Sequence, residues 1–309
     1  MYDAVVVGSG IGGLTAAALL SARGMNVCLL ERQSQVGGCI ARVEFSGHDF
    51  EPGMGLYTSF GPGGVYEKVF ARLPVDPPPT SLLSSPYVMR SADAADVTID
   101  REDLFSISGG PASLAERLAE SIKRSGGKVR LNSPVLRLSY GEAGHANGVD
   151  LLSGERVFAK RAIISNLTVW DTYGKLVGLN RTPPEVKKHL NTLRGAGIYV
   201  VYAIMDESAV SRLPGERMLV KDGEGEFTLA VSSTQTAPPG KRPVTFTCRT
   251  EVDSWFAYQT SEEDYEEWDQ QALEQIWNRL HAGLPELGSD IEIIEAAKML
   301  TPTVFQTVP

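Results

Sequence analysis

Cysteine is scarce in this 309-residue chain, which contains only Cys28, Cys39 and Cys248. Three scattered cysteines cannot form the disulfide framework of a small secreted domain, and none pairs with another ligand at metal-binding spacing. The sequence therefore predicts no metal site and favours a reducing compartment.

Long apolar runs and an excess of basic residues are also absent. No segment approaches the roughly 18 apolar residues of a membrane-spanning helix, and the first predicted strand begins at Tyr2, which leaves no room for a signal peptide. Lys and Arg total 29 against 38 Asp and Glu, which gives a net charge of -9. We therefore expect a cytoplasmic protein with no nucleic-acid partner, because dispersed cations on an acidic chain offer no face to phosphate backbones.

The first thirty residues carry the strongest pattern that is present. Asp3 to Val7 is a β-branched apolar run that ends in glycine, as expected of a strand buried on both faces. A Leu- and Ala-rich segment follows from Gly12 to Arg23, Gly24 marks its end, and Asn26 to Glu31 resumes the strand pattern. This order predicts a β-α-β unit with parallel strands.

The turn between the first strand and the helix matches G-x-G-x-x-G at Gly8, Gly10 and Gly13. In such a turn the first glycine permits the bend, the second lets the backbone approach a pyrophosphate, and the third lets helix and strand pack closely. The helix that follows offers free N–H groups and the positive end of its dipole at its N-terminus, which attract an anion. Glu31 ends the second strand, where a carboxylate accepts the ribose hydroxyls of an adenosine and repels a 2′-phosphate. The pattern predicts dinucleotide binding and disfavours NADP.

A double glycine at Gly37-Gly38 favours FAD over NAD, since it could let the chain pass close to the pyrophosphate of the same cofactor. A plain turn is the alternative interpretation. No second G-x-G-x-x-G follows a strand, so one dinucleotide is expected and a separate nicotinamide domain is not.

The remaining sequence predicts a loop-rich stretch from 36 to 79, a helix after Gly110, and a meander over 128–165 that includes Lys128 to Leu131. Strands at 198–205, 227–232 and 244–249 have the alternation of an antiparallel sheet, and a helix begins at Ser261. The predicted fold class is α/β, with a Rossmann-like FAD-binding domain over 1–170 to which 291–309 returns. A mostly antiparallel α+β substrate domain is predicted over 171–290.

The pattern from Val5 to Gly38 resembles the amine oxidase and phytoene desaturase superfamily of FAD-dependent oxidoreductases, whose FAD domain is glutathione-reductase-like. Further matches to its carotenoid branch lie at Phe50-Glu51-Pro52-Gly53, Ser108-Gly109-Gly110, Ser165-Asn166 and Thr301-Pro302. The resemblance also places Val135 where relatives hold the adenine edge with backbone groups. The cofactor contacts that motif and resemblance together imply are Gly8, Gly10, Ile11, Gly12, Gly13, Glu31, Arg32, Gly37, Gly38, Val135 and Asn166.

By this resemblance, a substrate C–H gives hydride to flavin N5 or takes it back, and the substrate is a small apolar polyene or isoprenoid. Desaturation, saturation and cis–trans isomerisation all remain open, and no catalytic side chain can be named. Because such a substrate resides in membranes, peripheral membrane contact through Leu56, Tyr57 and Phe60 is expected.

Two departures from the family keep other functions open. Only about ten residues separate the predicted strand at 96–99 from Gly109-Gly110, where desaturases carry a long substrate segment, and the chain stops at Pro309 before the family's closing FAD segment. An amine oxidase-like enzyme and a truncated, non-catalytic FAD-binding remnant are therefore the two alternatives.

Overall fold

The structure is a computed structural model that describes most of the chain. The described residues are 1–50, 53, 55–83, 87–91, 94–192, 195–232, 239–251, 262–288, 291–297 and 305–306.

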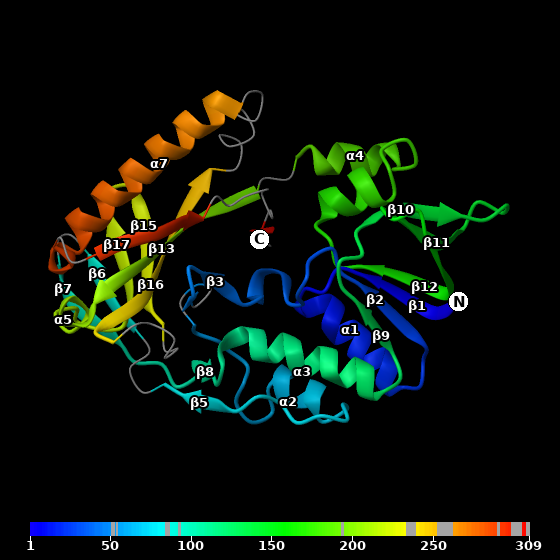
Figure 1. Cartoon of the computed structure of the whole chain (residues 1–309), viewed down its shortest axis with the longest axis horizontal. Helices are drawn as coiled ribbons and strands as arrows, with labels where there is room; N and C mark the ends of the chain where they lie inside the picture. The colour runs from blue at the N-terminus through cyan, green and yellow to red at the C-terminus, as the bar shows by residue number, and fades with distance from the viewer. Residues whose placement is uncertain are drawn as a thin grey trace. The chain divides into compact units, whose positions relative to one another are not determined.

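The chain divides into two compact units, each assembled from separate stretches of sequence (Figure 1). The first unit comprises Met1–Ala41, Thr58–Ser81 and Ile107–Leu193, and the second comprises Arg42–Tyr57, Leu82–Ser106 and Arg194–Pro309. This division differs from the boundary expected at residue 170. It also places 291–297 in the second unit, whereas we expected 291–309 to return to the FAD-binding domain.

The first unit is built on a six-stranded sheet with the order β10-β11-β12-β1-β2-β9. Strands β12, β1, β2 and β9 are parallel, whereas β10, β11 and the first part of β12 form an antiparallel meander. The segment from Lys128, expected in that meander, is instead the parallel edge strand β9, because it pairs with β2. The strands are β1 (Tyr2–Val7), β2 (Val27–Leu30), β9 (Lys128–Arg130), β10 (Val135–Tyr140), β11 (Ala146–Leu151) and β12 (Arg156–Ser165).

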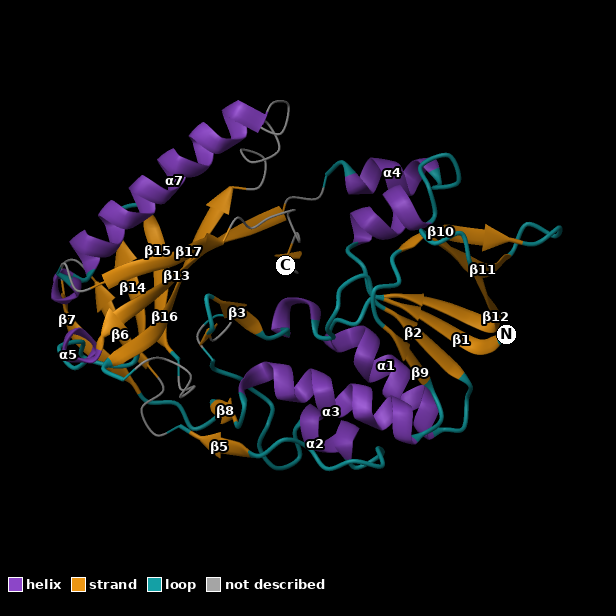
Figure 2. Ribbon diagram, in the orientation of Figure 1, coloured by secondary structure: helices purple, strands orange, loops and turns teal. Residues whose placement is uncertain are grey.

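Strand β1 is buried on both faces, as its apolar run predicts. Ala4 and Val6 pack into one core, and Val5 and Val7 pack into the other. Helices α1 and α3 cover the first of these faces, and residues of the meander cover the second (Figure 2). The alternation follows from the period of two in a strand, and it fixes β1 between two cores. The α/β fold class predicted for this part is therefore confirmed.

The helices of the first unit begin and end near the glycines and prolines that the sequence offers. α1 ends two residues before Gly24, and α3 begins at the Gly109-Gly110 pair, with Pro111 in its first turn. Both positions suit residues that begin or end helices. The helices are α1 (Ile11–Ala22), α2 (Val65–Phe70), α3 (Gly110–Arg124), η2 (Asp171–Leu176) and α4 (Pro184–Leu190), with the short helix η1 (Gly38–Ile40) after the double glycine.

The second unit is built on an eight-stranded sheet, with the order β17-β13-β16-β15-β14-β6-β7 and β18 paired to β13. Its pairs are antiparallel except for β6 with β14, so the predicted antiparallel character is confirmed. The segment from 291 pairs with β13 and completes this sheet. The strands are β6 (Tyr87–Ser91), β7 (Ala94–Ile99), β13 (Gly195–Asp206), β14 (Arg217–Asp222), β15 (Gly225–Val231), β16 (Lys241–Glu251), β17 (Ile291–Ala297) and β18 (Phe305–Gln306).

Two elements cover opposite faces of β13. Helix α7 (Glu262–Gly283) contributes Ile276 and Leu280 to the core that contains Tyr199, which confirms these positions as core residues. Tyr202 faces the other way and packs against the hairpin of β3 and β4. Ser261 and the side chains of Tyr265 and Trp268 lie outside the described residues. The remaining elements are β3 (Val43–Phe45), β4 (His48–Phe50), β5 (Thr80–Leu82), β8 (Phe105–Ile107), α5 (Glu207–Val210) and η3 (Pro285–Leu287).

Candidate functional site

The predicted site residues gather at the carboxyl edge of the parallel strands in the first unit. Gly8 follows β1, Glu31 follows β2 and Asn166 follows β12. Backbone hydrogen bonds hold these ends together, since the N–H of Gly8 donates to Leu30 O over 2.8 Å and that of Asn166 donates to Val7 O over 2.8 Å. This is the edge at which open parallel α/β sheets bind their ligands.

The glycine turn, Gly8 to Gly13, is tight enough to exclude side chains at specific positions. Gly8 has φ +92°, in the left-handed region that favours glycine. A Cβ on Gly13 would lie 2.2 Å from Gly8 O, so only glycine allows α1 to pack this closely on β1. Both glycines have the structural role that the motif predicts.

The N-terminus of α1 presents free backbone donors. Gly10 precedes the helix in an extended conformation, no side chain caps the helix, and its first turn contains no acidic residue. The first helical hydrogen bond is donated by the N–H of Leu14 to Gly10 O, over 2.9 Å. Ile11 and Gly12 are exposed. Uncapped N–H groups and the positive end of the helix dipole make this position suited to an anion.

The Asn166 side chain lies against this helix start. A Cβ on Gly10 would lie 2.6 Å from Asn166 Nδ2, and one on Gly12 would lie 2.7 Å from Asn166 Oδ1. The amide can donate two hydrogen bonds from the nitrogen that adjoins Gly10. The structure thus brings Asn166, identified from resemblance alone, to the glycine turn.

Glu31 is 7% exposed and is held by three protein donors. The Ser9 N–H and hydroxyl both donate to Glu31 Oε2, over 2.8 and 2.6 Å, and the Gln33 N–H donates to Oε1 over 2.9 Å. Sequence reasoning missed Ser9 because it treated this motif position as a spacer. The available signal was a small polar residue between two glycines, 22 positions before the acid.

The double glycine crosses the glycine turn. The N–H of Gly37 donates to Ser9 O over 3.0 Å, and a Cβ on Gly38 would lie 3.3 Å from the Cα of Gly10. Gly37 and Gly38 have φ angles of +121° and +57°. Their close approach to the turn is a fact of the structure, and contact with a pyrophosphate stays a prediction.

Val135 and Arg32 are the remaining predicted cofactor contacts. Val135 is half-buried at the start of β10, opposite Leu151, and Ser133, two residues earlier, donates its N–H to Glu31 O over 2.7 Å. The backbone that leads to Val135 therefore runs beside Glu31. Arg32 is exposed, and it is the only cation among the predicted contacts.

The other residues singled out from the sequence lie in segments other than the glycine turn or outside the described residues. Thr301-Pro302 and Glu51-Pro52 lie outside the described residues. Leu56, Tyr57 and Phe60, expected to meet a membrane, are all partly buried. The Tyr57 backbone pairs with that of Phe105, and the Phe60 and Tyr66 ring centroids lie 4.1 Å apart.

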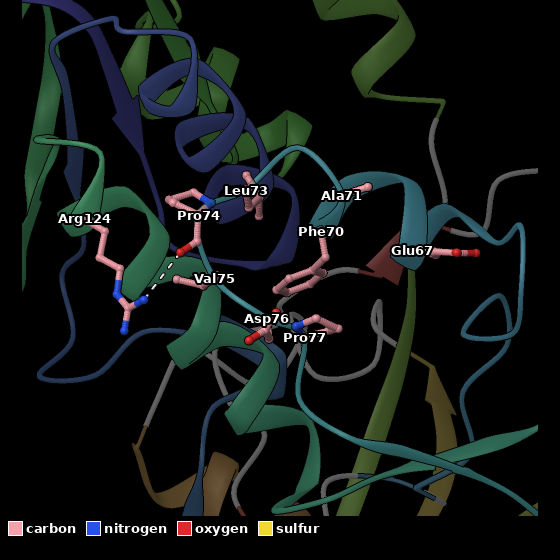
Figure 3. A pocket seen from close by; sticks show the side chains of 9 residues that line it. All are labelled: Glu67, Phe70, Ala71, Leu73, Pro74, Val75, Asp76, Pro77 and Arg124. Carbon is pink, nitrogen blue, oxygen red and sulfur yellow. Dashed lines mark hydrogen bonds between the residues drawn. The ribbon is translucent and has the colours of Figure 1, made fainter.

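A surface cavity of about 400 Å³ also lies in the first unit (Figure 3). Side chains of α2, of the segment that follows it and Arg124 of α3 surround it, and none of the predicted cofactor contacts does. The candidate site is therefore the glycine turn and not this cavity.

The residues at the carboxyl edge fit the adenosine diphosphate part of a dinucleotide. The uncapped helix start offers donors to a pyrophosphate, and the buried Glu31 carboxylate offers an acceptor to a ribose. Glycines at 10, 12 and 13 have no Cβ, which lets the helix start lie against Gly8 and the Asn166 amide at this edge.

Comparison with known families agrees with this fit. Residues 6–73 match the NAD(P)-binding Rossmann-like domain, and residues 89–309 match the family described as flavin-containing amine oxidoreductase. The chain belongs to the flavin-containing amine oxidoreductase family. A flavin cofactor is characteristic of that family.

Two curated relatives are similar over part of their length. A carotenoid 3,4-desaturase of Haloarcula japonica is 36% identical over 107 residues, which are 33% of this chain and 21% of the relative. A prolycopene isomerase of Daucus carota is 27% identical over 202 residues, which are 60% of this chain and 32% of the relative. The matched regions thus span no more than a third of either relative.

Solved structures share the fold. An oxidoreductase from Methanosarcina mazei superposes with a TM-score of 0.69 at 16% identity, covering 94% of this chain and 86% of that one. In the described part of the chain, no helix combines the length and apolar character needed to cross a membrane.

Proposed function

We propose that this chain binds FAD at the carboxyl edge of the first unit and transfers hydride between the flavin and an apolar polyene or isoprenoid. The observation that carries the proposal is the pairing of an uncapped helix N-terminus with the buried Glu31 carboxylate on one strand edge. The two sites match the two polar parts of an adenosine diphosphate.

Each residue has a defined part in binding. The N–H groups at the start of α1 and the Asn166 amide donate to the pyrophosphate, while Glu31 accepts from the adenosine ribose. The Gly37-Gly38 crossing keeps the backbone close enough to the glycine turn to enclose the ligand. The bound flavin would supply the hydride acceptor or donor. The protein's own contribution is position and exclusion of water.

The proposed substrate class is inferred from the names of the curated relatives. Carotenoids are polyenes, and both curated relatives carry names of enzymes that act on them. Desaturation, saturation and isomerisation are distinguished by whether the product has fewer hydrogens, more hydrogens or the same number.

The test is to purify the chain and record its visible spectrum before and after adding FAD. Bound flavin bands near one equivalent are expected. Anaerobic incubation with a detergent-solubilised polyene should then bleach the flavin bands if the polyene is oxidised, and chromatography should detect the product. A chain that stays colourless after FAD is added and desalted would contradict the proposal.

An amine oxidase-like activity is the second candidate, because the matching family is described as acting on amines. The two activities are separated by oxygen consumption. Turnover of a primary or secondary amine with release of hydrogen peroxide would replace the polyene proposal. Flavin binding with neither activity would identify the non-catalytic alternative.

We further propose that the chain meets its substrate at a membrane surface, since long polyenes dissolve in lipid rather than in water. Flotation with neutral phosphatidylcholine vesicles should recover the chain with the lipid, and more of it when the vesicles contain the polyene. A chain that remains in the aqueous fraction under both conditions would contradict this step.

A further inference from the structure

Ser9 is a buried polar residue whose two donors point to one acceptor. Its relative exposure is 0%, and both its N–H and its hydroxyl donate to Glu31 Oε2, over 2.8 and 2.6 Å. Hydrogen bonds to an ionised oxygen are shorter and about twice as strong as neutral ones. Ser9 therefore holds one carboxylate oxygen from two directions.

The geometry of these bonds limits what Glu31 can offer to a ligand. An ionised carboxylate has about four acceptor positions, two on each oxygen. Ser9 occupies the positions on Oε2, and the Gln33 N–H occupies one on Oε1 at 2.9 Å. The acceptor position left for a ribose hydroxyl is therefore on Oε1.

Ser9 also connects the carboxylate to the rest of the turn. Its carbonyl oxygen accepts the Gly37 N–H over 3.0 Å, and it lies between Gly8 and Gly10 in sequence. A single residue thus joins the glycine turn, the acid after β2 and the double-glycine crossing. Removing the Ser9 hydroxyl should therefore change the affinity for the ligand by altering the position of the Glu31 carboxylate.

We propose that Ser9 is a positioning residue for the adenosine end of the cofactor. Its hydroxyl fixes the Glu31 carboxylate so that Oε1 receives one ribose hydroxyl, and Ser9 itself does not contact the ribose. This inference rests on the proposed function, because it assumes an adenosine diphosphate group at the turn. Ser9 is then a second residue, besides Glu31, that determines how the adenosine ribose is recognised.

The experiment measures ADP binding to the full chain by calorimetry, which needs neither flavin nor turnover. Ser9→Ala removes the hydroxyl and keeps the backbone donor, and Ser9 is not in the left-handed region, so alanine fits its backbone. We expect ADP to bind about ten-fold more weakly, the typical effect of losing a hydrogen bond to a charged group. Ser21→Ala is the matched control, since Ser21 is a buried serine of α1 whose hydroxyl has no partner among the described residues; it should bind ADP unchanged.

A double-mutant cycle separates positioning from a general effect on the turn. If Ser9 acts through Glu31, then Ser9→Ala should cause little further loss in a Glu31→Gln background. Equal losses in both backgrounds, or unchanged ADP binding in Ser9→Ala, would overturn the inference.

The same measurements distinguish this inference from the proposed function. A wild-type chain that binds ADP, shows the Ser9 effect and takes up no flavin would overturn the function alone. A chain that binds flavin normally with no Ser9 effect on ADP would overturn the inference alone. Failure to bind either ligand would overturn both.

Discussion

The Oδ1 atom of Asn166 lies where a methyl group on Gly12 would have to go, with 2.7 Å between that atom and a Cβ built on Gly12. Gly12 has an ordinary helical backbone rather than a left-handed one. The space for a side chain is therefore taken by the residue that follows β12, and the Gly12 conformation itself would accept one. This distinction can be tested, because the neighbour can be removed.

Gly12→Ala should lower the thermal midpoint of unfolding in the wild-type chain and raise it in an Asn166→Ala background. The first effect comes from the clash with the amide, and the second comes from the higher helix propensity of alanine, worth up to about 1 kcal/mol. Differential scanning calorimetry of the wild type, the two single variants and the double variant measures both effects.

Gly13→Ala is the control for that reversal. Its Cβ would lie 2.2 Å from the backbone oxygen of Gly8, which removing a side chain cannot relieve. We expect destabilisation in both backgrounds. A Gly12→Ala effect of the same sign in both backgrounds would show that Asn166 is not what excludes the methyl group.

Glu31→Gln should weaken ADP binding about ten- to 100-fold, because the amide replaces one charged acceptor and turns a donor toward Ser9. The loss should be smaller for 2′-phospho-ADP, since the charge that repels the 2′-phosphate is removed. Titration calorimetry with both ligands measures the ratio. Glu120→Gln on the exposed face of α3, where it pairs with Arg117 and Arg124, should leave both affinities unchanged.

Arg90→Met should destabilise the second unit by about 2 kcal/mol at pH 7, because it breaks a partly buried ion network. Arg90 donates to Asp96 and Glu286 over 2.7 Å each and to Gly283 O over 3.1 Å. These bonds hold the hairpin of β6 and β7 to the end of α7 and to η3. Urea unfolding followed by tryptophan fluorescence measures the loss.

The same network predicts a pH dependence. The hydrogen bonds from Arg90 lower the pKa of both Asp96 and Glu286. A lowered carboxyl pKa stabilises the fold above the ordinary value of about 4, and that stabilisation is lost as the pH falls further. The stability difference between wild type and Arg90→Met should therefore shrink below about pH 4. A constant difference, or a comparable loss from Arg101→Met at the exposed Arg101–Asp103 pair, would contradict this account.

Thiol labelling of the folded chain should modify Cys39 first. Cys39 is exposed, whereas Cys28 and Cys248 are buried. Burial raises the pKa of all three thiols, that of Cys248 to about 11, so access of the reagent sets the order in which they react. At pH 8 one equivalent should react rapidly with a disulfide reagent, and three should react in urea. Cys39→Ser should abolish the rapid phase, and a rapid phase that persists would contradict the burial of the other two.

Local patterns in the sequence were sufficient for the first β-α-β unit and for placing the glycine turn and Glu31 at one edge of its strands. Strand β1, helix α1 and the end of β2 at Glu31 follow from apolar runs, a glycine stop and a motif of fixed spacing. These signals work because they depend on neighbours in the chain, and the period of a strand or helix appears within a few residues. The double glycine was also recognisable, since positive φ angles favour this residue.

Strand partners and buried polar contacts were decided only by the tertiary structure. The segment from Lys128 joins β2 rather than the meander, and the segment from Ile291 joins β13 rather than the first unit. An edge strand carries the same local pattern wherever it pairs, so long-range packing selects its partner. For the same reason the bond from Ser9 to Glu31 was invisible in the sequence, because two residues 22 positions apart meet only when β1 and β2 align.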